Sequence, residues 1–350
     1  MLAGLIIGLF TVQIIFTSQA PTPPPQPDKG PGGKQLTHAA VTRNRYESGA
    51  KEYWLYEPDA PRPKSAPVVI FLHGWGGTNP MYYGAWIDHI VRRGNIVVFP
   101  RYQSSILTPR ENFLPNTVEA VRNALERLQT KPGHVRPELD KVAAVGHSLG
   151  GLLAASVAAL AAESKLPSVR AVMAVEPGIT RSPVNVPLAD LEKIPAQTLL
   201  LAVAGDRDTL VDDADAKRIY YESTRVGSDN KDFVKLISDE RGRPGLVANH
   251  RAPTAPDRTY DNGEGDFTIR RRAVGSGPGG EEQPGPESPR LPVINALDYY
   301  GLWKLFDGLC DAAFFGRNRE YALGNTPQQR FMGRWSDGTP VKELLVTDRP

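Results

Sequence analysis

The stretch AVGHSLGGLL, residues 144–153, places Ser148 between two glycines, after an apolar run and before an alanine-rich one. Before the turn, residues 141–145 (KVAAV) have the composition of a strand buried on both faces. After Ser148, the alanine-rich residues have the composition of a buried helix. Glycine permits a tight turn and close backbone approach, so the stretch predicts a sharp strand-to-helix turn with the serine at its tip. Taken alone, it also fits a turn with no chemical role.

Other short apolar runs share this pattern, because they too end in glycine or polar residues. Further strands are predicted at 52–59, 67–77, 95–100, 169–178, 197–208 and 232–239, and helices at 116–130, 149–165, 212–223 and 293–315. Strands that alternate with helices indicate an α/β fold with a mostly parallel central sheet and helices on both faces. In such sheets the chemistry collects at the carboxyl ends of the strands, where HGWGG, GHSLGG, EPG and GDRD lie.

A serine hydroxyl needs a base to act as a nucleophile, and the base needs a carboxylate to orient it. Of the six histidines only His250 follows Ser148, and in strand–turn–helix hydrolases the base follows both the nucleophile and the acid. We predict Asp208 as the acid, because it lies just past a strand end. Glu176, at the end of the strand after the serine turn, is the competing candidate, and Asp206 is expected to brace its own turn.

An acyl-transfer site also needs backbone donors for the oxyanion. We expect the N–H of Leu149, at the start of a helix, to be one donor, and the N–H of Trp75, in the HGWGG loop, to be the other. His73 lies in that loop and is expected to be a structural hydrogen-bonding residue.

Composition excludes several other classes of protein. The net charge is only +2, and the tight basic run Arg270–Arg272 lies among Gly and Pro, so no nucleic-acid surface is expected. The single cysteine, Cys310, excludes a disulfide within the chain and a zinc site with more than one Cys ligand. It is expected to be a buried thiol. The acidic residues at 212–215 lack the glycine of a calcium loop, so no metal site is expected.

The N-terminus is predicted to be separate from the main domain. Residues 2–16 are apolar and uncharged, which predicts that 1–20 is a signal peptide or a membrane anchor, and hence a periplasmic, extracellular or membrane-anchored protein. Residues 21–34 read as a Pro/Gly-rich linker and 35–350 as the main domain. Within that domain, 251–292 is expected to be a flexible insertion, and the C-terminus to add a hairpin.

Together, the HGWGG loop, GHSLG, GDRD and His250 resemble the α/β-hydrolase superfamily over about residues 45–315. Within it the chain is most similar to the group of dienelactone hydrolases, chlorophyllases and polyester hydrolases. The resemblance implies a serine hydrolase that cleaves small-molecule or polymeric carboxylic esters through an acyl-enzyme, with a short lid and no cofactor or metal. A peptidase or acyltransferase with the same three residues is an alternative, and a non-catalytic, surface-anchored binding protein is another.

Overall fold

The computed structural model describes residues 20–105, 107–179, 188–264 and 292–350. The expectation for residues 1–19 lies outside this part of the chain, as do residues 265–291 of the predicted insertion and residues 180–187 of the short lid expected between Glu176 and Ile194. Within the described residues, no helix combines the length and the hydropathy needed to cross a bilayer.

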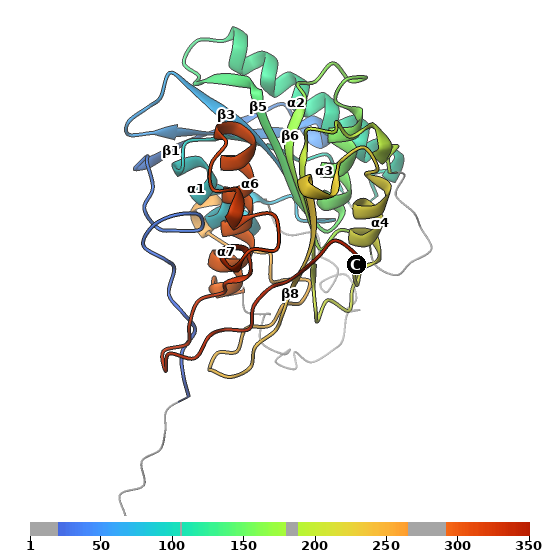
Figure 1. Ribbon diagram of the computed structural model, residues 1–350. Helices are drawn as coiled ribbons and strands as arrows, with labels where there is room; N and C mark the ends of the chain where they lie inside the picture. The colour runs from blue at the N-terminus through green and yellow to red at the C-terminus, as the bar shows by residue number, and fades with distance from the viewer. Residues whose placement is uncertain (1–19, 106, 180–187, 265–291) are drawn as a thin grey trace, which may run out of the picture.

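One sheet of nine strands runs through the molecule in the order β1-β2-β4-β3-β5-β6-β7-β8-β9 (Figure 1). The strands from β4 to β8 in this order pair in parallel, while β1, β2 and β9 add antiparallel strands at the two edges. This is the α/β-hydrolase arrangement that the sequence predicts. The strands are β1 (Ala40–Tyr46), β2 (Tyr53–Asp59), β3 (Ser65–Leu72), β4 (Ile96–Pro100), β5 (Arg136–His147), β6 (Val169–Val175), β7 (Leu199–Gly205), β8 (Lys231–Leu236) and β9 (Leu345–Thr347).

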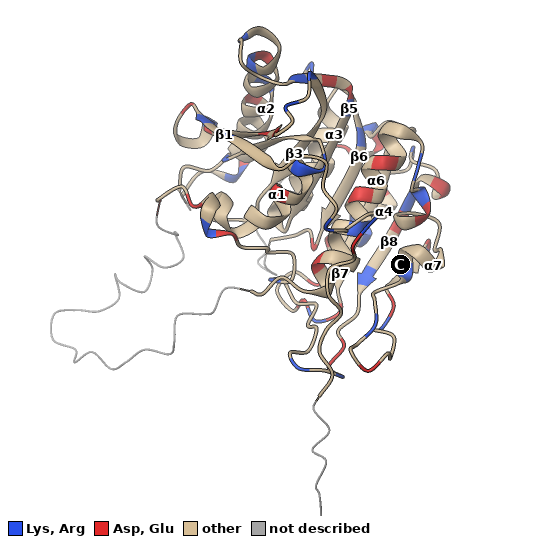
Figure 2. Cartoon of the chain, turned by 90° about the vertical axis from the view of Figure 1, so that its left-hand side faces the viewer, with Lys and Arg blue, Asp and Glu red and all other residues tan. Residues whose placement is uncertain are grey.

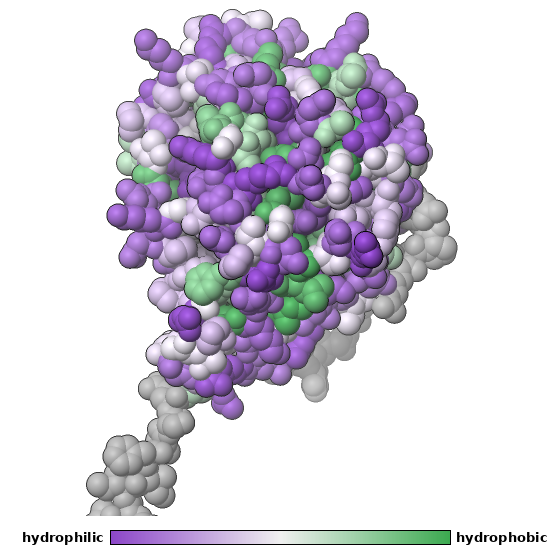
Figure 3. Space-filling view, viewed as in Figure 1, coloured by the Kyte–Doolittle hydropathy of each residue, from purple (hydrophilic) through white to green (hydrophobic). Residues whose placement is uncertain are grey.

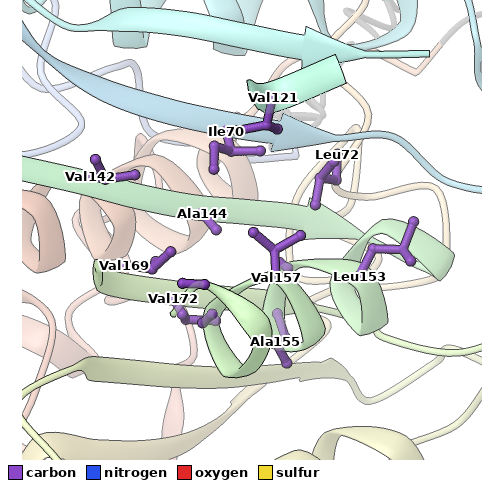
Figure 4. Close-up of a cluster of buried hydrophobic side chains, with 14 of the residues drawn as sticks. Ile70, Leu72, Val121, Val142, Ala144, Leu153, Ala155, Val157, Val169 and Val172 are labelled. Carbon is purple, nitrogen blue, oxygen red and sulfur yellow. The ribbon is translucent and has the colours of Figure 1, made fainter. Parts of the chain in front are cut away.

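Helices cover both faces of the sheet. On each face, one cluster of buried apolar residues fills the space between the helices and the sheet. One cluster packs α2, α3 and α4 against the sheet, and the other packs α1 and α6 against the opposite face. Figure 4 shows part of the first cluster, in which Val157 of α3 lies among strand residues such as Val142 and Ala144. The helices are α1 (Gly84–Arg92), α2 (Phe113–Thr130), α3 (Leu149–Leu160), α4 (Ala214–Glu222), α6 (Lys304–Phe315) and α7 (Pro327–Arg330), with a π-helix, η7 (Leu297–Trp303), before α6.

The Pro/Gly-rich stretch predicted as a linker is docked on the domain. The backbone N–H of Gly32 donates to Asp307 of α6 at 2.7 Å. At the other end of the stretch, the Pro21 carbonyl accepts from Arg243 N–H at 2.9 Å. We call residues 20–34 the N-terminal strut, because both of its ends are bonded to the main domain.

The first part of the predicted insertion, residues 251–264, is bonded to the domain. The N–H of Ala255 donates to Tyr82 O, and the N–H of Asp257 donates to Met81 O, each at 2.9 Å. Glu264 pairs with Arg101 at 2.6 Å. These bonds hold residues 251–264 against the domain, although their sequence is polar and rich in turn formers.

The C-terminal segment contains the Ser-Asp-Gly turn of the predicted hairpin. Its antiparallel pairing is a single bridge between Arg334 and Pro340. The chain then continues to β9, which pairs with β8 and extends the sheet. Lys and Arg alternate with Asp and Glu over the face shown in Figure 2.

Candidate active site

Ser148 lies at the tip of the turn between β5 and α3. Its φ of 57° and ψ of −125° are a strained conformation for a non-glycine residue. A Cβ on Gly146 would lie 2.0 Å from the Gly150 carbonyl oxygen, and a Cβ on Gly150 would lie 2.1 Å from Leu72 O. Both positions therefore need glycine, which is the reason for the G-x-S-x-G spacing.

The three residues predicted as nucleophile, base and acid form one hydrogen-bonded chain. Ser148 Oγ lies 2.9 Å from Nε2 of His250. Nδ1 of His250 lies 2.7 Å from Oδ2 of Asp208. When Nδ1 carries the ring proton, its N–H group donates a hydrogen bond to the carboxylate. Nε2 then has a free lone pair that can accept the serine proton. The carbonyl oxygen of Gly178, at 3.2 Å, is a second acceptor within reach of the Ser148 hydroxyl.

Backbone donors fix the carboxylate of Asp208. Its Oδ1 accepts from the N–H groups of Leu210 at 2.9 Å and Val211 at 3.2 Å. Burial raises the pKa of Asp208. The hydrogen bond and charge of His250 and the two backbone donors together lower this pKa by more than burial raises it, so the net shift is downward. Asp208 is therefore ionised at neutral pH and can stabilise an imidazolium.

Glu176, the competing acid, lies beside the same imidazole without bonding it. Its Oε2 is 3.8 Å from His250 Nδ1, beyond hydrogen-bonding distance. The side chain is fully buried, and neither carboxyl oxygen has a partner among the described residues. Burial and the nearby Asp208 charge raise the pKa of Glu176 well above its usual range, which keeps this carboxyl protonated.

A second set of bonds links the serine turn to the HGWGG loop. The hydroxyl of Tyr83 accepts from Gly74 N–H at 3.0 Å and lies 2.9 Å from His147 Nδ1. Burial lowers the pKa of His147 to about 3, so the ring is neutral and Nδ1 can accept the Tyr83 proton. Sequence reasoning missed Tyr83, because nothing in its local pattern distinguishes it from an ordinary helix-start aromatic residue.

The loop predicted to supply an oxyanion donor is held close to the serine. A Cβ on Gly74 would lie 3.2 Å from Ser148 Cβ, and Gly76 N–H donates to Gln103 Oε1 at 2.9 Å. Trp75 lies between these two glycines. Leu149 is the first residue of α3, where a backbone N–H has no partner within the helix. The predicted pair of N–H groups thus lies on the two segments that adjoin Ser148.

His73 has the structural position predicted for it. Its ring nitrogens lie 2.6 Å from Gly74 O and 2.7 Å from Arg101 O. Burial lowers the pKa of His73 to about 4, so the neutral ring donates to one carbonyl at a time. Tyr102 stacks on this ring and is completely buried, so it braces the loop.

The described residues contain one grouping with the composition of a metal site. His147, Glu176 and His250 each offer a ligand atom, and these atoms lie within 4.8 Å of one another. His250 already bonds Ser148 and Asp208 through its two ring nitrogens, so neither nitrogen is left for a metal ion. The geometry therefore fits proton transfer better than metal ligation.

One comparison with known proteins gives a match. Residues 32–187 match the model of the chlorophyllase family, which is an α/β-hydrolase type of family. No curated protein matches the chain. The matched segment includes the HGWGG loop and Ser148, and it ends before Asp208 and His250. The match supports a hydrolase of the α/β type that acts on esters.

Proposed function

We propose that this α/β-hydrolase, of the chlorophyllase and dienelactone-hydrolase-like group, is a serine carboxylic-ester hydrolase. The observation that carries the proposal is the chain of hydrogen bonds from Ser148 Oγ through His250 to Asp208, at 2.9 and 2.7 Å. Each residue has the neighbour that its role requires, and the serine is fixed by a turn that only glycines permit.

The reaction proceeds in two halves. Ser148 Oγ attacks the ester carbonyl carbon while His250 Nε2 takes the hydroxyl proton, and the carbonyl oxygen becomes an oxyanion facing the N–H groups of Trp75 and Leu149. His250 then returns the proton to the leaving alcohol, which leaves an acyl group on Ser148. Water, deprotonated by His250, attacks the acyl-enzyme, and His250 returns this proton to Ser148 Oγ as the carboxylic acid leaves. Removing one oxyanion donor typically costs about 10²–10³ in rate.

Export is part of the same proposal. The uncharged apolar run at 2–16 supports a leader or an anchor, and both place the enzyme outside the cytoplasm. Fractionation of cells that express the full chain, beside a variant with Ile6→Lys and Ile7→Lys, tests this. Loss of export in the variant supports the proposal, and equal distribution of the two proteins contradicts it.

The activity is tested with the full chain and p-nitrophenyl acyl esters from acetate to palmitate. Ester hydrolysis and labelling by a fluorophosphonate probe are expected for the wild type, and both are expected to vanish in Ser148→Ala. Labelling without ester turnover would favour a peptidase or an acyltransferase. The absence of both would overturn the proposal in favour of a binding protein.

A further inference from the structure

Exposed apolar side chains border the candidate active site. Of the nine large apolar residues that are exposed within the described chain, four lie on loops that follow the carboxyl ends of β3, β4, β7 and β8. We call these four the apolar rim: Trp75, Leu107, Leu210 and Val247. The strands are parallel, so these loops lie at the same end of the sheet.

Contacts place two rim residues next to the reacting groups, and chain position places the other two near them. Trp75 follows Gly74, where an added Cβ would lie 3.2 Å from Ser148 Cβ. Leu210 donates its N–H to Asp208 Oδ1 at 2.9 Å. Leu107 lies four residues after Gln103, which holds Gly76, and Val247 lies three residues before His250. Leu107 is 84% exposed, so this rim does not close over the site by itself.

The N-terminal strut begins at this same end of the sheet. Pro21 O bonds Arg243 N–H at 2.9 Å, and Arg243 lies in the loop between β8 and His250. Thr22 and Ser336 bond each other twice, at 2.9 and 3.1 Å. In Figures 1 and 2 the described chain starts at the lower end of the molecule, beside these loops, and Figure 3 shows the same start in space-filling form. The described chain therefore begins at the active-site end of the domain, and the apolar run precedes it in the sequence.

A lipid surface suits both features. Residues 2–16 are apolar and uncharged, which suits a segment anchored in the hydrocarbon of a membrane. Arg243 and Arg251 are exposed on the loop that carries Val247 and His250, and basic side chains near a membrane favour anionic headgroups. The basic residues and the apolar N-terminal run favour a lipid surface, whereas a polymer surface would use the rim alone.

We propose that the active-site end docks on a lipid surface through the apolar rim, so that Ser148 faces the bilayer and the substrates are esters that partition into it. The rim inserts at the level of the headgroups, the strut fixes the orientation, and the ester reaches Ser148 without passing through bulk water. The hydrolysis of these esters rests on the proposed function, whereas the docking does not.

Tryptophan fluorescence reports this docking directly. The chain has five tryptophans, and all are described. Trp75 is 42% exposed, whereas the other four are 6% exposed or less. Quenching of the full chain by brominated lipid in phosphatidylglycerol–phosphatidylcholine vesicles is therefore expected to come from Trp75, and it should disappear in Trp75→Phe. Undiminished quenching in that variant, or none in the wild type, would overturn the proposal.

A rim variant tests whether the same surface drives binding. Leu107→Ser with Val247→Ser is expected to weaken sedimentation with these vesicles at least tenfold, while hydrolysis of dissolved p-nitrophenyl acetate stays unchanged. Phe315→Ser is the matched control: Phe315 is exposed, but it lies against Lys141 at the amino-terminal part of β5, at the opposite end of the sheet. The control should bind as the wild type does.

The two proposals fail in different ways. If dissolved ester is not hydrolysed and Ser148 is not labelled, the proposed function is wrong, whatever the vesicle result. If dissolved ester is hydrolysed but the rim variant binds vesicles as the wild type does, the docking surface is wrong. Binding to polyester particles without binding to vesicles would also overturn the lipid proposal, and would favour a polymeric substrate.

Discussion

Asp208 and Glu176 place carboxyl oxygens 2.7 Å and 3.8 Å from the same atom, Nδ1 of His250. The pKa of Asp208 is lowered and that of Glu176 is raised, so one carboxyl is charged and the other carries a proton. Two acids near one base can thus coexist without sharing a charge, and their roles can be separated by substitution.

Asp208→Asn is expected to lower kcat by about 10⁴, because an amide at this position no longer holds the imidazole in the required tautomer or stabilises its charged form. Glu176→Gln is the matched control, since an amide resembles a protonated carboxyl, and it should change kcat less than about threefold. Steady-state kinetics on p-nitrophenyl acetate compares the two. The reverse order of effects would assign the acid role to Glu176.

Replacing glycine with alanine is predicted to destabilise the protein at Gly150, in the serine turn, but not at Gly227, which lies outside it. Gly150→Ala would place a Cβ 2.1 Å from a backbone oxygen, whereas nothing lies within 4 Å of a Cβ at Gly227. Because backbone cannot move aside as a flexible side chain can, Gly150→Ala should lower the free energy of unfolding by about 3 kcal/mol or more. Gly227→Ala should leave it nearly unchanged. Chemical denaturation measures the free energy of unfolding of both variants. Equal stability of the two would contradict the close backbone approach at the serine turn.

Asp298 predicts a pH dependence of stability. Burial raises its pKa to about 8, although backbone N–H donors, including that of Asn295, oppose the shift. The folded protein thus holds a proton that the unfolded chain releases near pH 4, so this contribution is complete below pH 4 and is lost as pH rises toward 8. In that window the free energy of unfolding should fall by up to about 1.4 kcal/mol per pH unit.

Asp298→Asn keeps an acceptor for the backbone but removes the titration. Thermal unfolding from pH 4 to pH 9 should show a flatter profile for the variant, with higher stability than the wild type near pH 8. Parallel profiles for the two proteins would show that Asp298 does not titrate in this range.

The N-terminal strut depends on one buried carboxylate. Asp307 accepts from Gly32 N–H at 2.7 Å and from His89 at 2.8 Å, and it pairs with Arg93 at 3.2 Å. Burial raises the pKa of Asp307, but Arg93 and His89 together lower this pKa by more than burial raises it. The carboxylate is therefore charged. Asp307→Ala leaves these donors without their acceptor and should cost about 3–5 kcal/mol of stability.

The same variant should release the strut. Limited proteolysis is expected to cut residues 20–34 much faster in Asp307→Ala than in the wild type. Asp28→Ala is the control, because Asp28 and Lys34 form an exposed pair within the strut and their loss should change little. If both variants are cut at the wild-type rate, Asp307 does not hold the strut.

The central fold and Ser148 could be predicted because their signals are local, whereas His250 could be chosen because no other histidine follows Ser148. Buried parallel strands are apolar throughout, and the turn at Ser148 requires glycines at fixed spacing. The edge strand β1 could not be predicted, since AVTRNRY is polar and forms a strand through its pairing with β2.

The strut was missed for a related reason. Pro and Gly in its sequence are typical of a linker, but the residues that bind it, such as Asp307, lie more than 270 positions away in the chain. Tyr83 and its bond to His147 are likewise a product of the tertiary fold. Local patterns do not carry such contacts.

The first bond of the strut has a consequence for maturation of the chain. Pro21 contacts the domain through its carbonyl oxygen, and a proline nitrogen has no hydrogen to donate. Cutting the chain after Ala20 would therefore remove no hydrogen bond made by Pro21. A released form and a tethered form of the protein would share the same catalytic domain and intrinsic activity, and would differ only in where that activity is confined.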